Sequence, residues 1–178
     1  MRKIITVFSL IAMTFFTPAQ AFDVGSSHYG NETLGTLTCN GHLTLNGTTI
    51  QDDLTVNGSL VAENVMIEEM HVNGQVTLKG THINGLAEIN GYLRAENTDI
   101  RALLSLRSSK LDLFDSLTHG IIIKQSSDPR SAQVVNLNNT QVYGDIVFEG
   151  GNGLVVADED SSVEGEVIGG KIIAKEIQ

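Results

Sequence analysis

The chain has 178 residues, with 21 acidic against 11 basic side chains and a formal net charge of −10 at pH 7. Such an acidic surface repels phosphate groups, which argues against nucleic acid and anionic lipid as partners. Cys39 is the only cysteine, so an internal disulfide is excluded and packing must stabilise the fold.

The first 21 residues have the pattern of a secretory signal peptide. Arg2 and Lys3 precede an apolar run over residues 4–16, and small residues follow as far as Ala21. The run is shorter than the roughly 20 residues that a bilayer requires. We therefore expect cleavage after Ala21 rather than an uncleaved membrane anchor. The mature chain is then periplasmic or secreted and has no membrane span.

Residues 22–34 show no clear period and are predicted to be an N-terminal lead-in or cap. Residues 35–178 are predicted to be one domain built from a repeat, with a loop insertion near 126–131 around Pro129. The stretch Leu54–Gly58 reads apolar, variable, apolar, Asn, Gly. Near-copies of it start at residues 37, 70 and 87.

Each repeat places apolar residues two positions apart, which is the side-chain period of a β-strand. The first column of such residues is Leu37, Leu54, Met70, Ala87, Leu104 and Ile121. Equivalent short strands of successive repeats can pair in parallel. We therefore predict an all-β, single-stranded parallel β-helix, a three-sided solenoid with 16–17 residues per coil and about seven coils. A hairpin barrel or sandwich is the alternative, because Asn-Gly is also a hairpin turn signal.

Other columns follow from the same register. A third apolar column consists of Ile50, Ile67, Ile83, Ile100, Leu117, Val142 and Val163. A hydroxyl-rich column two residues earlier consists of Thr48, Val65, Thr81, Thr98, Thr140 and Ser161. Asn40, Asn57, Asn73 and Asn90 are predicted to stack as a polar ladder. Cys39 occupies an apolar column and is expected to be a buried, unreactive thiol.

Three outward rows carry the side chains that could perform chemistry. One row contains His71, Glu88 and Ser105, and a second contains Met66, His82, Asp99 and Ser116. In both rows the acid lies between His and Ser, whereas the histidine of a catalytic triad must contact both. The third row places Arg94 beside Asp112, which predicts a surface ion pair. We predict no catalytic residues.

The candidate metal ligands form incomplete sets. His71 with Glu88 and His82 with Asp99 would supply two ligands each, and zinc needs three or four. The acidic loop 158–160 lacks the glycine-rich nonapeptide pattern of calcium-binding β-rolls. We therefore predict no metal-binding or cofactor-binding residues.

The apolar columns, the 16–17-residue coil and the Asn-Gly corners resemble the bactofilins, also called polymer-forming cytoskeletal proteins. The likeness covers roughly Leu34 to Leu117 and, more loosely, Val142 to Gly170. The resemblance implies a right-handed, three-sided β-helix that assembles end to end into filaments without nucleotide. Most members of that family are cytoplasmic, so the export signal departs from the family pattern.

The sequence thus favours an exported, non-enzymatic β-solenoid with a structural or self-assembly role in the cell envelope. It would form a homo-oligomer or filament through its open strand edges, or bind an envelope protein or glycan. One alternative is a periplasmic or extracellular module that binds carbohydrate or protein. Another is a degenerate polysaccharide-active β-helix enzyme. A working site is expected where the repeat fails, at the two ends and in the loops 126–131 and 158–160.

Overall fold

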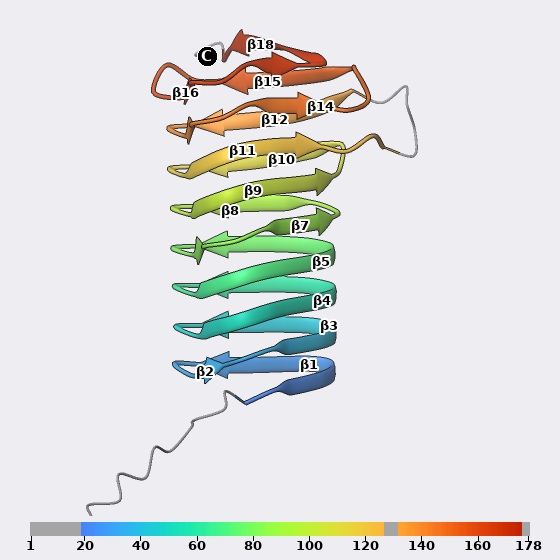
Figure 1. The fold of residues 1–178 in the computed structure, drawn as a ribbon, viewed down its shortest axis with the longest axis vertical. Coiled ribbons are helices and arrows are strands. Elements are labelled where there is room, and N and C mark those ends of the chain that lie inside the picture. The colour runs from blue at the N-terminus through green and yellow to red at the C-terminus, as the bar shows by residue number, and fades with distance from the viewer. Residues whose placement is uncertain (1–18, 127–131, 176–178) are drawn as a thin grey trace, which may run out of the picture.

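The computed structural model describes residues 19–126 and 132–175, which form an 18-stranded parallel sheet wound into a solenoid (Figure 1). Within these residues the secondary structure is β throughout, and no helix is long and apolar enough to cross a membrane. The strands are β1 (Ala21–Gly30), β2 (Thr33–Leu34), β3 (Leu37–Asn46), β4 (Thr49–Glu63), β5 (Met66–Lys79), β6 (His82–Ile83), β7 (Ala87–Asn90), β8 (Leu93–Glu96), β9 (Asp99–Arg107), β10 (Lys110–Phe114), β11 (Leu117–Ile123), β12 (Gln133–Asn138), β13 (Gln141–Val142), β14 (Ile146–Phe148), β15 (Gly153–Ala157), β16 (Ser162–Val163), β17 (Val167–Ile168) and β18 (Gly170–Ala174).

The pairing register confirms that one sequence repeat is one coil. Leu37 pairs with Leu54 and Leu54 pairs with Met70, and every pairing between strands is parallel. The parallel direction rules out the hairpin alternative, in which neighbouring strands would run antiparallel. The solenoid has about 9 turns, compared with the seven expected from the repeat.

Much of this difference comes from the N-terminal segment, where the sequence predicts a lead-in or cap. Residues 21–30 form β1, which pairs with β3 along its whole length, from Ala21 opposite Leu37 to Gly30 opposite Asn46. This segment is therefore a coil in its own right. Backbone pairing does not require apolar side chains, so the coil leaves little trace in the pattern of hydrophobic residues.

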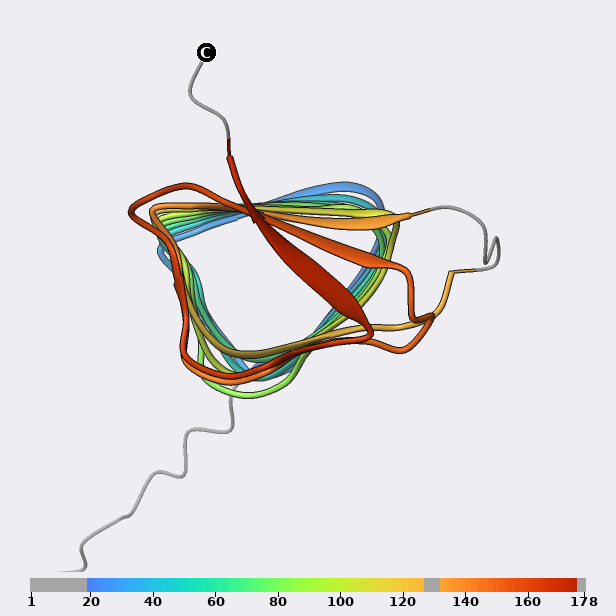
Figure 2. The same cartoon turned by 90° about the horizontal axis from the view of Figure 1, so that it is seen from above.

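The view along the axis shows successive coils superposed on one closed outline (Figure 2). The chain runs counter-clockwise as it rises toward the viewer, so the β-helix is right-handed. Near the C-terminus β18 departs from this outline and crosses over the end of the solenoid (Figure 2). Glycines permit this crossing, because a Cβ at Gly153 would lie 2.1 Å from the Phe148 ring and one at Gly170 would lie 2.7 Å from it.

The predicted inward columns form the core. The first column, Leu37, Leu54, Met70, Ala87, Leu104 and Ile121, is fully buried, and so is Cys39. The hydroxyl column is also buried at Thr48, Thr81, Thr98 and Thr140, and its side chains bond to backbone carbonyls. Burial and the nearby Asp23 raise the pKa of the Cys39 thiol, which favours the unreactive neutral form.

The predicted column positions are wrong for Ser116 and Leu117. The coil that leaves Asp99 is one residue longer than the repeat, so Asp99 pairs with Leu117 and Ile100 with Thr118. Leu117 is 38% exposed, while Ser116 and Thr118 are buried. Side chains alternate between the two faces along a strand. One extra residue therefore turns outward the side chain that was predicted to point inward, and turns inward the one that was predicted to point outward.

The Asn-Gly corners at residues 40–41, 57–58 and 73–74 bend the strands without interrupting their pairing, whereas at 90–91 the pairing breaks between β7 and β8. Asn57 donates to Asn40, Asn73 to Asn57 and Asn90 to Asn73, each through its side-chain amide at 2.8 Å, which confirms the predicted ladder. The glycine beside each asparagine packs against the preceding coil, and Gly58 has φ +146.

Two predicted features fall largely outside the described residues. The predicted signal peptide ends at Ala21, and its first 18 residues are outside the structure described. The predicted loop insertion near 126–131 includes residues 127–131, which also lie outside it. The predicted solenoid domain 35–178 is described as far as Lys175.

Candidate functional site

The outward row of His71, Glu88 and Ser105 forms an ion pair and not a triad. His71 pairs with Glu88 and Glu88 with Ser105 in the strand register, so His71 and Ser105 lie two coils apart, about 10 Å. His71 Nδ1 is 3.5 Å from Glu88 Oε2, and Lys124 Nζ donates to Glu88 Oε1. The hydrogen bond from Lys124, assisted by His71, lowers the pKa of Glu88 although burial acts in the opposite direction.

The second row has the same character. His82 Nδ1 lies 3.8 Å from Asp99 Oδ2, and Arg101 Nε donates to the same oxygen at 2.9 Å. Ser116, which was expected in this row, points inward and donates to the carbonyl oxygen of Phe114 at 2.6 Å. Its hydroxyl is therefore committed to the backbone and lies on the other side of the sheet from Asp99.

The predicted ion pair between Arg94 and Asp112 is replaced by other contacts, although the two residues are register partners. Arg94 stacks over the Phe114 ring at 4.3 Å, and Lys110 Nζ contacts Asp112 Oδ2 at 2.9 Å. Tyr92 and Asn136 also donate to the Asp112 carboxylate, at 2.5 and 2.6 Å. Burial acts to raise the pKa of Asp112, but these donors outweigh it and lower the pKa.

A shallow cavity of about 220 Å³ adjoins this network on the outer face. Its lining residues are Asp112, Phe114, Asn136, Asn138, Val156 and Lys175. Lys175 Nζ donates to the side-chain oxygen of Asn138 at 2.6 Å, so amide and ammonium groups surround an apolar floor.

The acidic loop 158–160 has a structural role at Asp158. This carboxylate accepts the backbone N–H of Asn139 at 3.0 Å and the hydroxyl of Ser161 at 2.5 Å. Burial acts to raise the pKa of Asp158, but the hydrogen bonds lower it. The loop thereby fixes a turn between neighbouring coils.

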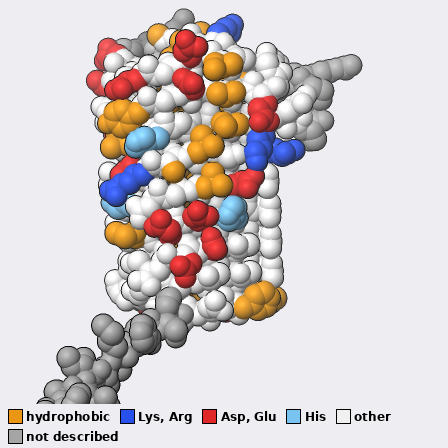
Figure 3. Space-filling view, viewed as in Figure 1, with side chains coloured by type: hydrophobic (Ala, Val, Ile, Leu, Met, Phe, Trp, Pro, Cys, Tyr) orange, Lys and Arg blue, Asp and Glu red, His pale blue; other side chains and the backbone are white. Residues whose placement is uncertain are grey.

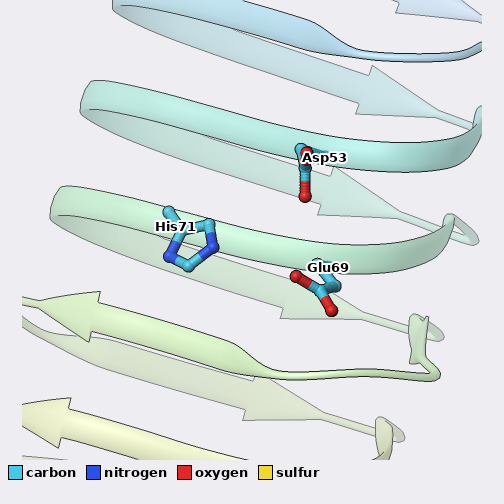
Figure 4. A group of neighbouring side chains, drawn as sticks. All are labelled: Asp53, Glu69 and His71. Carbon is cyan, nitrogen blue, oxygen red and sulfur yellow. The ribbon is translucent and has the colours of Figure 1, made fainter.

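A cluster absent from the sequence predictions brings Asp53 and Glu69 to His71. One ligand atom of each of these three side chains lies within 4.8 Å of the others. Figure 4 shows Asp53 pointing toward the next coil, where the Glu69 carboxylate points toward the His71 ring. The sequence signal is positional, because Asp53 and Glu69 immediately precede the column residues Leu54 and Met70.

The irregular coil length produces this cluster. The step from Leu54 to Met70 is 16 residues, and the pairing of β4 with β5 shifts between Ile50 and Asp53. The shift is a β-bulge that places Asp53 directly opposite Glu69. Figure 3 shows acidic side chains gathered on one face of the molecule. The exposed acidic residues of β4 and β5 are Asp52, Asp53, Glu63, Glu68 and Glu69.

At the N-terminal end, one edge of β1 has no strand partner among residues 19–126 and 132–175, and a polar cap covers the core. Asp23 lies in the column of Cys39, and Tyr29 lies in the column of Leu45. The Tyr29 hydroxyl donates to Asp23 Oδ2 at 2.5 Å across this end. That hydrogen bond, with partial burial, raises the pKa of Tyr29 to about 12. The inward side chains of this coil are therefore satisfied without a further coil.

The C-terminal end differs, because an apolar inward side chain reaches solvent. Ile172 stacks on Val155, which is fully buried, yet Ile172 itself is 50% exposed. Ile168 and Ile173 are also exposed, but they pair with outward residues of the preceding coil, Val147 and Val156. β18 pairs with β15 along one edge, and no strand of the described residues pairs with its other edge.

Comparisons with known proteins give no match. No protein-family model matches the chain, and no curated protein or solved structure is detectably similar to it. The geometry therefore assigns the chain only to a fold class, the right-handed parallel β-solenoids.

Proposed function

We propose that this chain is an exported, non-enzymatic structural protein that self-associates through the C-terminal end of its solenoid. The observation that carries the proposal is the exposure of Ile172, which occupies a core column but has no coil above it. Fully burying a large aliphatic side chain contributes about 1.5–3 kcal/mol, so covering the exposed half of Ile172 contributes about half of that. The open edge of β18 supplies backbone donors and acceptors.

The two ends suit different roles. A second copy placed on the N-terminal end would meet Asp23 and Tyr29, whose hydrogen bond already closes that end. A second copy placed on the C-terminal end would cover Ile172, whose register partner Val155 is fully buried. We therefore favour a two-fold, end-to-end dimer over an open filament, because the same surface on both copies closes the assembly.

The export part of the proposal rests on residues 1–21, with their positive start, apolar run and small residues before Ala21. A structural role also agrees with the state of the polar rows. Glu88, Asp99 and Asp112 are each engaged by a basic side chain, so none is placed as a free general base.

The test measures the mass of the mature chain by light scattering over a range of protein concentrations, with negative-stain microscopy of the same samples. We expect dimers that dissociate on dilution and that strengthen at higher salt, because both copies are acidic. Ile172→Glu should give monomers. Val24→Ser, which changes a 74% exposed residue at the other end, should leave the dimer intact.

Two outcomes would overturn this proposal. One is a monomer at every concentration and salt level. The other is dissociation by Val24→Ser but not by Ile172→Glu, which would place the contact at the β1 edge. Long filaments in the micrographs would retain the structural role but refute the closed dimer.

A glycan-binding module is the second candidate, and the cavity beside Asp112 favours it. Amide groups of Asn136 and Asn138 surround the apolar floor of this cavity, and its volume of about 220 Å³ suits one sugar ring. A glycan array probed with the mature chain and with Asn138→Ala tests it. Binding that the substitution abolishes would support this function, and no binding to any glycan would remove it.

A further inference from the structure

We propose that Asp53, Glu69 and His71 form a binding site for a divalent transition-metal cation such as Zn²⁺. The three side chains come from adjacent strands, Asp53 from β4 and the other two from β5. Their ligand atoms lie within 4.8 Å of one another, and Figure 4 shows them converging on the space between the two coils. The site is distinct from the association surface at the C-terminal end.

The strand register provides an argument for a cation that is independent of this proximity. Asp53 and Glu69 are directly opposite each other, and like charges in that position destabilise a sheet. Among the described residues, the carboxylates of Glu88, Asp99 and Asp112 each pair with a lysine or arginine. The ion pairs found there include neither Asp53 nor Glu69, so no lysine or arginine of the described residues neutralises this pair.

The donor set indicates the class of metal. One imidazole nitrogen with two carboxylates suits zinc and related first-row metals, whereas Mg²⁺ and Ca²⁺ prefer oxygen ligands in larger number. Zinc binds such atoms at about 2.0–2.2 Å, so its ligands lie closer together than 4.8 Å. Asp53 and Glu69 are exposed and can rotate to close this gap. Three protein ligands leave a fourth position for water.

A carboxylate outside the cluster orients the histidine. Glu88 Oε2 lies 3.5 Å from His71 Nδ1, and Lys124 holds Glu88 from its other side. Carboxylates commonly position a metal-binding imidazole in this way. Because the ligands come from two coils, a bound ion would join β4 to β5 and raise the thermal stability of the solenoid.

The experiment titrates Zn²⁺ into the metal-free mature chain by isothermal titration calorimetry and records the melting temperature with and without the metal. We expect one Zn²⁺ per chain and a higher melting temperature. His71→Gln and Glu69→Gln should each weaken binding by at least about 10–100-fold, which is the cost of losing only an outer-shell partner. Each substitution should also remove most of the thermal shift.

His82→Gln is the matched control, because it removes the other histidine–carboxylate pair on this surface. It should leave the affinity and the thermal shift unchanged. The proposal is overturned if the chain takes up no Zn²⁺, if His82→Gln weakens binding as much as His71→Gln, or if Ca²⁺ binds more tightly than Zn²⁺. Circular dichroism of each metal-free variant verifies that it folds.

Discussion

Replacing Gly58 by alanine tests the contact between coils at the Asn-Gly corners. A Cβ at Gly58 would lie 2.0 Å from the carbonyl oxygen of Gly41 in the preceding coil. Carbon–oxygen contacts ordinarily lie at about 3.3 Å or more, so the coils would have to separate by about 1 Å. That separation weakens the bond from Asn57 to Asn40 and the backbone bonds beside it.

The magnitude follows from two contributions. A backbone conformation restricted to glycine, here φ +146, costs about 1–3 kcal/mol for alanine. Two or three weakened hydrogen bonds add about 1 kcal/mol each. We therefore expect Gly58→Ala to lower the free energy of unfolding by about 4 kcal/mol.

Gly25 offers the matched control, because it lies in the first coil that the structure describes, where it pairs with Gly41. Its φ is also positive, at +100, but a Cβ there would meet nothing within 4 Å. Gly25→Ala should cost about 2 kcal/mol, from the backbone conformation alone. Urea denaturation followed by circular dichroism measures both variants. Equal losses would refute the argument that contact between coils requires glycine.

Two further predictions concern the polar networks. Asn57→Ala removes two ladder bonds and Asn90→Ala removes one, so thermal denaturation should show about twice the destabilisation for Asn57→Ala, at about 1 kcal/mol per bond. Equal destabilisation by the two substitutions would show that the hydrogen bonds of the ladder do not contribute additively to stability. Asp112→Asn should cost about 2 kcal/mol at neutral pH, because buried charge-assisted hydrogen bonds are weakened. The lowered pKa of Asp112 stabilises the fold above the unfolded-state value of about 3.9, and this contribution is lost as pH falls through the folded-state pKa. Urea denaturation should therefore show the difference between wild type and variant narrowing below about pH 4, and a constant difference would contradict the assignment.

The core was predictable because its side chains repeat at a constant interval. Leu54 and Val56 point inward and Asn57 lies at a corner, as the period of the strand and the position of glycine indicate. The first coil was not predictable in the same way, because its inward residues include Asp23 and Ser27. The inward side chains of a terminal coil border solvent at the end of the solenoid, so polar residues can occupy these positions. The alternation of apolar residues is then lost from the sequence.

A change of coil length explains the misassigned residue. The longer coil after Asp99 turned Ser116 inward, and a constant period cannot locate such a shift, because either strand can absorb the extra residue. The pairing of Asp53 with Glu69 follows from the predicted pairing of Leu54 with Met70, but the period alone does not show that both carboxylates reach His71. The contacts of Asp112 were missed for a different reason, since Tyr92 and Asn136 reach it from other coils.

Hydrogen exchange at two protein concentrations tests the central claim of C-terminal self-association most directly. The amides of β18 on the open edge should exchange rapidly in dilute solution and become protected at high concentration, when a second copy covers Ile172. The amides of β1 should exchange at the same rate in both samples. Protection confined to β1, or exchange in β18 that does not depend on concentration, would contradict the account.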